Sequence, residues 1–220
     1  MNLPGQEPMR LVLASNNAKK LAELRALLAG LPLDIKAQGT LGIPEADEPH
    51  HSFIENALAK ARQAARASGS AALADDSGLC VGALGGAPGV ISAHFAGELV
   101  LAQGDDREAH RRRQDAANNA ALLARLQGVP DRRAHFISTL VAIRHADDPE
   151  PLVAVGRWPG EILTAARGKH GFGYDPLMFI PALGATVAEL HAVTKNQHSH
   201  RARSAALLRA MLADAWHLAC

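Results

Sequence analysis

Short apolar runs alternate with longer segments of helical periodicity along most of this chain. Leu11-Val12-Leu13-Ala14 predicts a buried strand. Leu21, Leu24 and Leu28 then recur at helical spacing, and Gly30 is suited to end that helix. The first predicted elements are therefore a strand, a polar loop and a helix.

The rest of the chain continues this alternation. Ser52 to Glu55 has the pattern of a helix capping box, and the helix that it opens is expected to end before Gly69. A turn joins two of the later strands, which predicts an antiparallel hairpin. Helices between strands predict an α/β fold with a mixed sheet. The remaining strands are predicted at 34–37, 71–73, 136–143, 152–158 and 177–180, with helices at 106–127 and from about residue 201 onward.

Two adjacent carboxylates, Asp75 and Asp76, follow the apolar run Ala71-Ala72-Leu73 and precede Ser77-Gly78. Polar loops at strand ends are where α/β folds place their chemistry. Carboxylate oxygens suit Mg²⁺, which takes one or two of them together with substrate phosphates. Asp-Ser-Gly is equally typical of an ordinary turn, so this stretch alone favours neither interpretation.

The first polar loop, Ser15-Asn16-Asn17-Ala18-Lys19-Lys20, is a candidate phosphate site. A helix N-terminus presents free N–H groups and partial positive charge, while Asn17 adds an amide and Lys20 a mobile cation. The glycines of a Walker A loop are missing. Taken by itself, the stretch favours an ordinary capped helix start with solvated lysines.

Two segments near the C-terminal end also carry candidate chemistry. Gly171-Phe172-Gly173-Tyr174-Asp175 places an aromatic pair between glycines in a chain with 4% aromatic residues. This fits either a stacking surface for a flat ligand or a packed loop. Lys195, His200 and Arg201 lie at the start of the last predicted helix, where the helix dipole disfavours cations. That misfit favours an anionic or polar ligand.

Composition narrows the classes of function. The 220 residues are 48% hydrophobic and carry a net charge of +1, so they can bury a large core and provide no overall basic field for nucleic acid. Arg111-Arg112-Arg113 lies among acidic residues and predicts a solvated face. Cys80 and Cys220 give no disulfide framework. No apolar run approaches membrane-spanning length, so no membrane partner and a cytoplasmic setting are expected.

Six motifs in order carry a resemblance to a known enzyme family. The chain resembles the inosine/xanthosine triphosphate pyrophosphatases, which act on non-standard purine nucleotides, over about 190 of its 220 residues. Two positions depart from the family pattern, since Ser52 stands where Thr is usual and His94 where Arg is usual. The motifs are Ser15-x-Asn17-x-x-Lys20-x-x-Glu23, Ser52-Phe53-x-Glu55-Asn56-Ala57, Ala74-Asp75-Asp76-Ser77-Gly78-Leu79, Leu84-Gly85-Gly86-x-Pro88-Gly89, Gly171-Phe172-Gly173-Tyr174-Asp175 and Ser199-His200-Arg201.

The resemblance implies an elongated two-lobe α/β fold, with a long mixed twisted sheet flanked by helices and an active-site cleft between the lobes. Residues 1–10 are expected to be an N-terminal extension, and residues 11–218 a single two-lobed domain. The resemblance further implies a homodimer, a Mg²⁺ cofactor, and hydrolysis of dITP, ITP and XTP to the monophosphate and pyrophosphate.

The resemblance also implies residue roles. Asp76 is expected to bind Mg²⁺ and to activate water, with Asp47 or Glu48 as a further metal carboxylate, while the separate roles of Asp75 and Asp76 stay open. The base is expected to stack on Phe172. Donors from His200 and Arg201 would satisfy the 6-oxo group of hypoxanthine and xanthine, which adenine lacks. The remaining expected substrate contacts are Ser15, Asn16, Asn17, Ala18, Lys19, Lys20, Ser77, Gly173, Tyr174, Asp175 and Lys195.

Two alternatives stay open at this point. One is a pyrophosphatase for other modified nucleotides, such as modified pyrimidines. The other is a non-catalytic nucleotide-binding module, against which Asp75, Asp76 and Lys20 argue because such a module needs no metal carboxylates. Nucleic-acid binding has only the run Arg111 to Arg113 in its favour.

Overall fold

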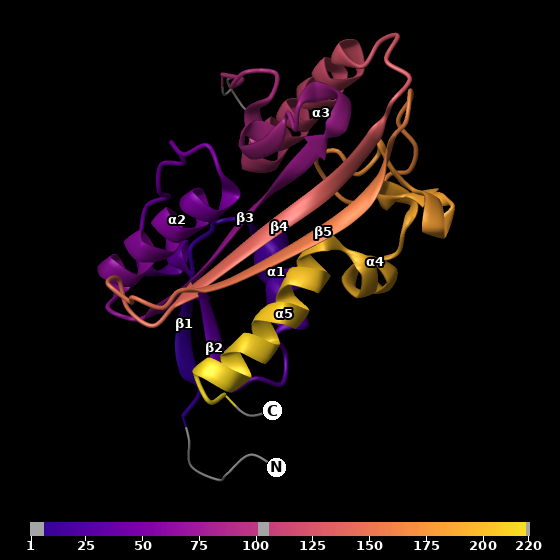
Figure 1. Cartoon of the computed structure of the whole chain (residues 1–220). Helices are drawn as coiled ribbons and strands as arrows, with labels where there is room; N and C mark the ends of the chain where they lie inside the picture. The colour runs from indigo at the N-terminus through magenta and orange to yellow at the C-terminus, as the bar shows by residue number, and fades with distance from the viewer. Residues whose placement is uncertain (1–6, 101–105, 219–220) are drawn as a thin grey trace. The chain divides into compact units, whose positions relative to one another are not determined.

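The computed structural model describes residues 7–100 and 106–218. Seven strands form one mixed sheet in the order β2-β1-β3-β4-β5-β6-β7 (Figure 1). The strands are β1 (Met9–Leu13), β2 (Leu33–Ala37), β3 (Ala71–Val81), β4 (Arg133–Ile143), β5 (Leu152–Ile162), β6 (Met178–Ile180) and β7 (Ala185–Thr186). The helices are α1 (Ala18–Leu27), α2 (Phe53–Ser68), α3 (Arg107–Arg125), α4 (Ala192–His198) and α5 (His200–Ala215). The α/β class with a mixed sheet flanked by helices is confirmed.

The chain divides into two compact units, which are described separately. Unit 1 comprises Met1–Asp76, Ser138–Arg157 and Ser199–Cys220. Unit 2 comprises Ser77–Ile137 and Trp158–His198. The predicted extension at 1–10 lies partly outside the described residues, and β1 begins at Met9, two residues before the predicted strand.

Helices cover both faces of the strands of unit 1, because the strand side chains alternate between two apolar cores. Leu11 and Leu13 of β1 pack with leucines of α1 and α5, in a core that also buries Trp216. Val12 and Ala14 point the other way and pack against the alanines of α2. Period-two alternation of this kind is expected for a strand that is buried on both sides.

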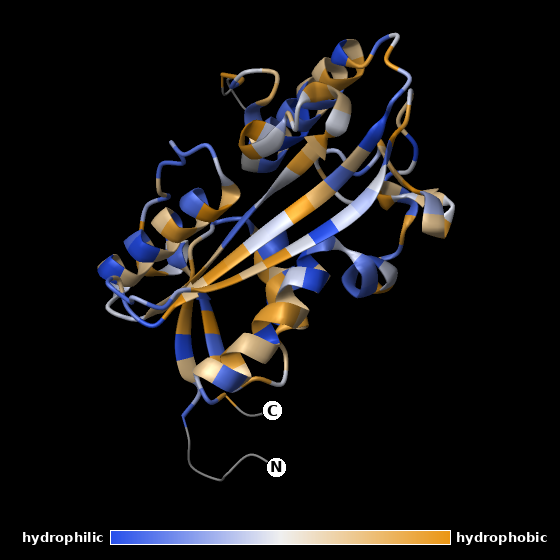
Figure 2. Cartoon of the chain, viewed as in Figure 1, coloured by the Kyte–Doolittle hydropathy of each residue, from blue (hydrophilic) through white to orange (hydrophobic). Residues whose placement is uncertain are grey.

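The length of β3 differs from the prediction. β3 continues to Val81, so Asp75 and Asp76 lie inside a strand, and both the predicted strand end and the predicted turn are wrong. Figure 2 shows β3 changing from apolar to hydrophilic and back to apolar along its length. β3 can continue because β4 is still its neighbour in the sheet, although β1, on its other side, ends at Leu13.

The core of unit 2 is separate from those of unit 1. Leu79 and Val81 of β3 pack there with Leu122 of α3 and with Trp158 at the beginning of the unit 2 part of β5. Tyr174 of the glycine-rich loop is buried in the same core. β4 and β5, the two strands of the hairpin that the sequence predicts, are neighbours in the sheet.

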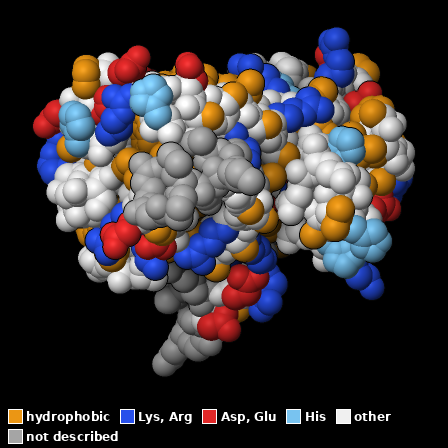
Figure 3. Space-filling view, turned by 90° about the horizontal axis from the view of Figure 1, so that it is seen from below, with side chains coloured by type: hydrophobic (Ala, Val, Ile, Leu, Met, Phe, Trp, Pro, Cys, Tyr) orange, Lys and Arg blue, Asp and Glu red, His pale blue; other side chains and the backbone are white. Residues whose placement is uncertain are grey.

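The surface has no large region of one charge on the face that Figure 3 shows, where Lys and Arg side chains are interspersed with Asp and Glu. This agrees with the net charge of +1 and gives no support to a nucleic-acid surface. Among the described helices, none is both long enough and apolar enough to cross a membrane. Cys80 is half-buried, and Cys220 lies outside the described residues.

Candidate active site

The candidate site in unit 1 lies where the direction of the sheet connections changes. β1 is parallel to β2 on one side and to β3 on the other. Ligands of open α/β sheets bind at the carboxyl ends of strands at such a switch point. Leu13, the last residue of β1, pairs with Leu73, so Asp75 lies two residues beyond the end of the β1 ladder. The loop from Ser15 to Asn17 leaves β1 at the same end.

Asp75 faces α1 and α5, where cations surround it. Arg201 donates from Nε to Asp75 Oδ2 at 2.9 Å, and Lys20 Nζ lies 3.4 Å from the same oxygen. Ser138 of β4 donates to Asp75 Oδ1 at 3.0 Å. Burial raises the pKa of Asp75, but the charges of Arg201 and Lys20 lower it by more, and the pKa ends below its usual value. Asp75 is therefore a buried carboxylate whose charge is balanced by Arg201 and Lys20.

Arg201 is almost fully buried and joins two carboxylates. Besides Asp75, it donates from Nη1 to Glu23 of α1. A buried guanidinium with two carboxylate partners is held in a fixed orientation. Gly156 of β5 allows α5 to approach this closely, because a Cβ there would overlap the carbonyl oxygen of His200. His200 and Arg201 thus form the buried first turn of α5, with Ser199 as its N-cap.

Asp76 faces α2, on the opposite side of the strand. Lys60 Nζ donates to Asp76 Oδ1 at 2.8 Å, to Glu48 Oε1 at 3.0 Å and to the main-chain oxygen of Asp75 at 3.3 Å. Burial raises the pKa of Asp76 to about 6, although Lys60 acts to lower it. Adjacent in sequence, Asp75 and Asp76 do not form a carboxylate pair, since β3 directs them to opposite faces.

The cluster around Asp76 fits a divalent cation that prefers oxygen ligands. Lys60 places one positive charge between the carboxylates of Glu48 and Asp76. Asp76 Oδ2 is buried and accepts no hydrogen bond from any described residue, so one carboxylate oxygen is left for a ligand. No three His, Cys, Asp or Glu side chains of the described chain form a metal cage. A metal here would take two carboxylates and complete its shell with water and substrate oxygens, as Mg²⁺ commonly does.

The acidic loop before α2 is held by Asn56. The His50 main-chain N–H donates to Asn56 Oδ1 at 3.0 Å, and Asn56 Nδ2 donates to the His50 oxygen at 3.2 Å. Asn56 is fully buried, so this pair of bonds fixes the chain two residues after Glu48. Asp47 is exposed, whereas Glu48 reaches Lys60.

The loop after β1 combines a helix cap with candidate phosphate ligands. Asn17 is the N-cap of α1, and its Oδ1 accepts from the N–H groups of Lys19 and Lys20. Ser15 Oγ accepts from the Asn17 N–H at 3.2 Å. Ala18 and Lys19 are exposed, while the Lys20 side chain reaches the Asp75 cluster. The structure therefore contains the capped helix start, with Lys20 directed toward the carboxylates.

Asn16 depends on a glycine for its position. A Cβ on Gly39 would overlap Oδ1 of Asn16, an atom that is buried and accepts no hydrogen bond from the described residues. We expect Gly39→Ala to displace the Asn16 amide while costing less than about 1 kcal/mol of stability, because a side-chain end can move more easily than backbone. The measurement is KM for the triphosphate that the resemblance implies, beside thermal unfolding, with Gly82→Ala as a comparison because an added Cβ there meets no atom closer than 3.7 Å. An unchanged KM would show that Asn16 contacts no substrate.

A second polar cluster lies in unit 2, on the glycine-rich loop and α4. Lys195 Nζ donates to Asp175 Oδ2 at 2.9 Å and lies 4.7 Å from the centre of the Phe172 ring. The Phe172 N–H donates to the same Asp175 oxygen at 3.0 Å. Tyr174 is buried, and its hydroxyl donates to the main-chain oxygen of Ser92. Phe172, Asp175 and Lys195 thus lie in contact with one another, while the Tyr174 ring packs in the apolar core of unit 2.

Lys60 and Ser138 are site residues that the sequence interpretation missed. Lys60 lies one helical turn after Asn56, so both project from the same face of α2. Alanines at positions 57, 61 and 64 give this face room against the sheet. A lysine in a buried alanine stripe needs an anionic partner, and that was an available signal. Ser138 had no comparable signal, because a serine inside an apolar strand carries no information about which carboxylate it meets.

The predicted substrate contact Ser77 is half-buried and follows Asp76 directly on β3.

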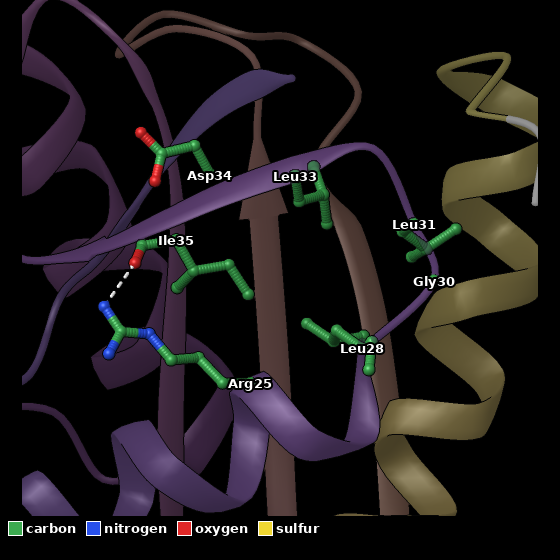
Figure 4. A pocket seen from close by; sticks show the side chains of 8 residues that line it. Arg25, Leu28, Gly30, Leu31, Leu33, Asp34 and Ile35 are labelled. Carbon is green, nitrogen blue, oxygen red and sulfur yellow. Dashed lines mark hydrogen bonds between the residues drawn. The ribbon is translucent and has the colours of Figure 1, made fainter. Parts of the chain in front are cut away.

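A hollow elsewhere in unit 1 does not coincide with these residues. Its volume is about 400 Å³, and Arg25 spans it by donating to the main-chain oxygen of Ile35 at 2.7 Å (Figure 4). None of the residues predicted to bind substrate or metal lines it. The hollow lies between the end of α1 and β2, lined by Arg25, Leu28, Ala29, Gly30, Leu31, Leu33, Asp34 and Ile35.

The fold and the buried cluster define an α/β protein with a carboxylate and lysine site at a switch point of its sheet. The chain belongs to the Ham1 family, whose sequence profile matches residues 11–211. A dITP/XTP pyrophosphatase of Methylibium petroleiphilum is 65% identical over 208 residues, covering 94% of this chain and 99% of that protein. One of Leptothrix cholodnii is 66% identical over 212 residues, covering 96% of this chain and 100% of that protein.

Solved structures show the same relationship. A HAM1 protein from Coxiella burnetii superimposes with a TM-score of 0.82 at 39% identity, covering 93% of this chain and 98% of that one. A nucleoside-triphosphatase / dITP/XTP pyrophosphatase from Mycobacterium abscessus has a TM-score of 0.67 at 40% identity, covering 91% and 98%. The family expected from the six motifs is confirmed.

Proposed function

We propose that this protein hydrolyses non-standard purine nucleoside triphosphates, namely dITP, ITP and XTP, to the monophosphate and pyrophosphate, with Mg²⁺ as cofactor. The observation that carries the proposal is the cluster of buried Asp76 and Lys60 with exposed Glu48, beside Lys20. The names of the relatives in the Ham1 family support the substrate class. Removal of such nucleotides from the cellular pool, in a cytoplasmic homodimer, is part of the same proposal.

The reaction requires attack of water on the α-phosphorus while pyrophosphate leaves. Asp76 is the residue proposed to accept the proton of the attacking water, because burial raises its pKa to about 6 and so makes it a better base than an exposed carboxylate. Glu48 and Asp76 would hold the Mg²⁺, which neutralises charge on the phosphate oxygens when bound. Lys60 and Lys20 supply two further positive charges from α2 and α1.

Asp75 has a different role from that of Asp76. Its carboxylate is fully engaged by Arg201, Lys20 and Ser138, so it positions these side chains and does not act as a base. A carboxyl group whose pKa is held below its usual range is a poor proton acceptor at neutral pH. We therefore propose base catalysis for Asp76 and anchoring for Asp75.

Recognition of the base is proposed to involve the cluster in unit 2. Phe172 offers an aromatic ring for stacking, and Asp175 an acceptor for a ring N–H. The 6-oxo group needs donors, for which we retain His200 and Arg201. Arg201 already donates to Asp75 and Glu23, so we propose His200 as the more readily tested of the two.

Metal binding should depend on pH through Asp76. The pKa of this group is raised to about 6, so below that pH a proton occupies the carboxylate and must leave when metal binds. We expect the affinity for Mg²⁺ to be constant above about pH 7 and to fall by up to about tenfold per pH unit below 6. Calorimetric titration between pH 5 and pH 8 would measure this. A flat profile would show that Asp76 is not a ligand.

The function is tested by product analysis of purified protein with Mg²⁺ and ITP, XTP, GTP or ATP. We expect monophosphate and pyrophosphate from ITP and XTP, and little product from GTP or ATP. Orthophosphate in place of pyrophosphate would move the attack to the terminal phosphate and contradict the placement of the metal. Hydrolysis of a modified pyrimidine triphosphate alone would change the substrate class, and ITP binding without any product would indicate a binding module.

A further inference from the structure

Two side chains of α3 hold the glycine-rich loop by the backbone of a single residue. The Gly173 N–H donates to Asp115 at 2.8 Å, and Asn119 Nδ2 donates to the Gly173 main-chain oxygen at 2.9 Å. Asp115 and Asn119 are four residues apart, so they project from the same face of the helix. Both hydrogen-bonding groups of Gly173 are therefore taken by one helix.

The contacts around Gly173 hold the loop, and with it the ring of Phe172, in one position. Gly173 has a φ of +61°, a left-handed conformation that glycine adopts at low cost. On the other side, the Phe172 N–H donates to Asp175, which also accepts from Lys195. The loop is thus fixed on both sides of Phe172, by α3 and by the pair of Asp175 and Lys195.

The two hydrogen bonds that Asp115 and Asn119 make to Gly173, called the clamp from here on, are not needed to stabilise unit 2. Asn119 Oδ1 is buried and accepts no hydrogen bond from the described residues, so the amide carries an unsatisfied oxygen. A leucine of similar size would avoid that cost, and the neighbouring α3 residues Leu122 and Leu123 already pack in the apolar core. The amide gains only the bond to Gly173, which sets the position of the loop.

We propose that Asp115 and Asn119 are positioning residues for the nucleobase, which act by clamping Gly173 and so holding Phe172 in its stacking position. This inference rests on the proposed function, because it requires a base at Phe172. Holding a stacking ring in place before the ligand arrives lowers the ordering cost of binding. Loss of the clamp should weaken binding of the base while leaving the chemistry at the phosphate unchanged.

The test compares the wild-type protein with Asn119→Leu and Asp115→Ala. Arg112→Ala, an exposed change on the same helix, is the matched control. Hydrogen exchange of the peptide spanning residues 168–176 reports the clamp without any turnover. KM and kcat for ITP report its effect on the substrate. The inhibition constant of inorganic tripolyphosphate reports a ligand that has phosphates but no base.

We expect Asn119→Leu to speed exchange in the loop and to raise KM for ITP about fivefold, since one hydrogen bond is lost. kcat and the tripolyphosphate constant should stay within about twofold of wild type, as should every value for Arg112→Ala. Asp115→Ala should act in the same direction. Both changes release the same residue, so their effects should not add in the double variant.

Three results would overturn the inference. Unchanged exchange in both variants would show that α3 does not clamp the loop. Faster exchange with an unchanged KM would show that the clamp does not serve the base, and an equal loss for tripolyphosphate would show an effect on the phosphates instead. If the wild type releases no pyrophosphate from any triphosphate, the proposed function fails by itself. Exchange and direct binding of inosine monophosphate would then still decide whether the clamp positions a base.

Discussion

Asp76→Asn should lower kcat for ITP by about 10³-fold or more and leave the protein folded. The amide keeps the shape of the side chain but removes the base and a charged metal ligand. The free energy of unfolding should not fall, and the pKa of Asp76 gives the sign of its contribution. Since burial raises the pKa of Asp76 to about 6, its contribution to stability is present at low pH and is lost as the pH rises through 6. At pH 7 the neutral amide removes this unfavourable buried charge, and Lys60 keeps Glu48 as a charged partner, so the lysine is not left uncompensated.

The measurement is pyrophosphate release under saturating ITP, with thermal unfolding recorded on the same preparation. Asp147→Asn makes the same chemical change at an exposed turn of unit 1 and should keep full activity. An Asp76→Asn protein with more than a tenth of wild-type kcat would contradict the assignment of the base. Loss of cooperative unfolding would instead show that Asp76 is needed for the fold.

Arg201→Met should lower the free energy of unfolding by about 3–5 kcal/mol. Methionine keeps much of the apolar length of arginine, but it leaves Asp75 and Glu23 facing each other without the guanidinium that bridges them. Removing one partner of a buried ion pair costs this much because an uncompensated charge remains inside the protein. Lys20 compensates only in part, since it lies 3.4 Å from Asp75.

Urea denaturation gives this difference, provided that the slope of the transition is unchanged. Arg203→Met replaces an exposed arginine two residues along α5 and should cost less than about 1 kcal/mol. A loss below about 1 kcal/mol for Arg201→Met would show that the buried network contributes little. If the loss is large, a changed preference between ITP and ATP in any Arg201 variant cannot be read as base recognition, and His200 becomes the residue to vary.

The sequence predicted the elements better than it predicted the contacts of the site. The apolar runs at β1, β4 and β5 and the capped helix α2 are where periodicity placed them, because local patterning determines local structure. The polar run from Asp75 to Gly78 was expected to follow the end of a strand, because its residues are typical of a loop or turn, but it lies within β3. Only the sheet neighbour β4 keeps them in a strand.

The contacts around Asp75 and Asp76 required the tertiary structure. Arg201 comes from a helix far from β3 in sequence, whereas Lys60 comes from α2, which directly precedes β3. In neither case does the local sequence state which carboxylate the cation will meet. The family motifs pointed to Asp76, but they did not separate its role from that of Asp75. Strand geometry sends the two side chains to opposite faces, and the proposed separation of their roles rests on the partners that each meets there.

Each unit contains one buried tryptophan, whose fluorescence can report on the folding of that unit. The chain has two tryptophans. Trp216 is buried in a core of unit 1 and Trp158 in the core of unit 2. Indole emission shifts to longer wavelength when the ring meets water, so Trp158→Phe and Trp216→Phe would each leave one fluorophore. Melting curves of the two single-tryptophan proteins would show whether unit 1 and unit 2 lose their structure at one temperature or at two.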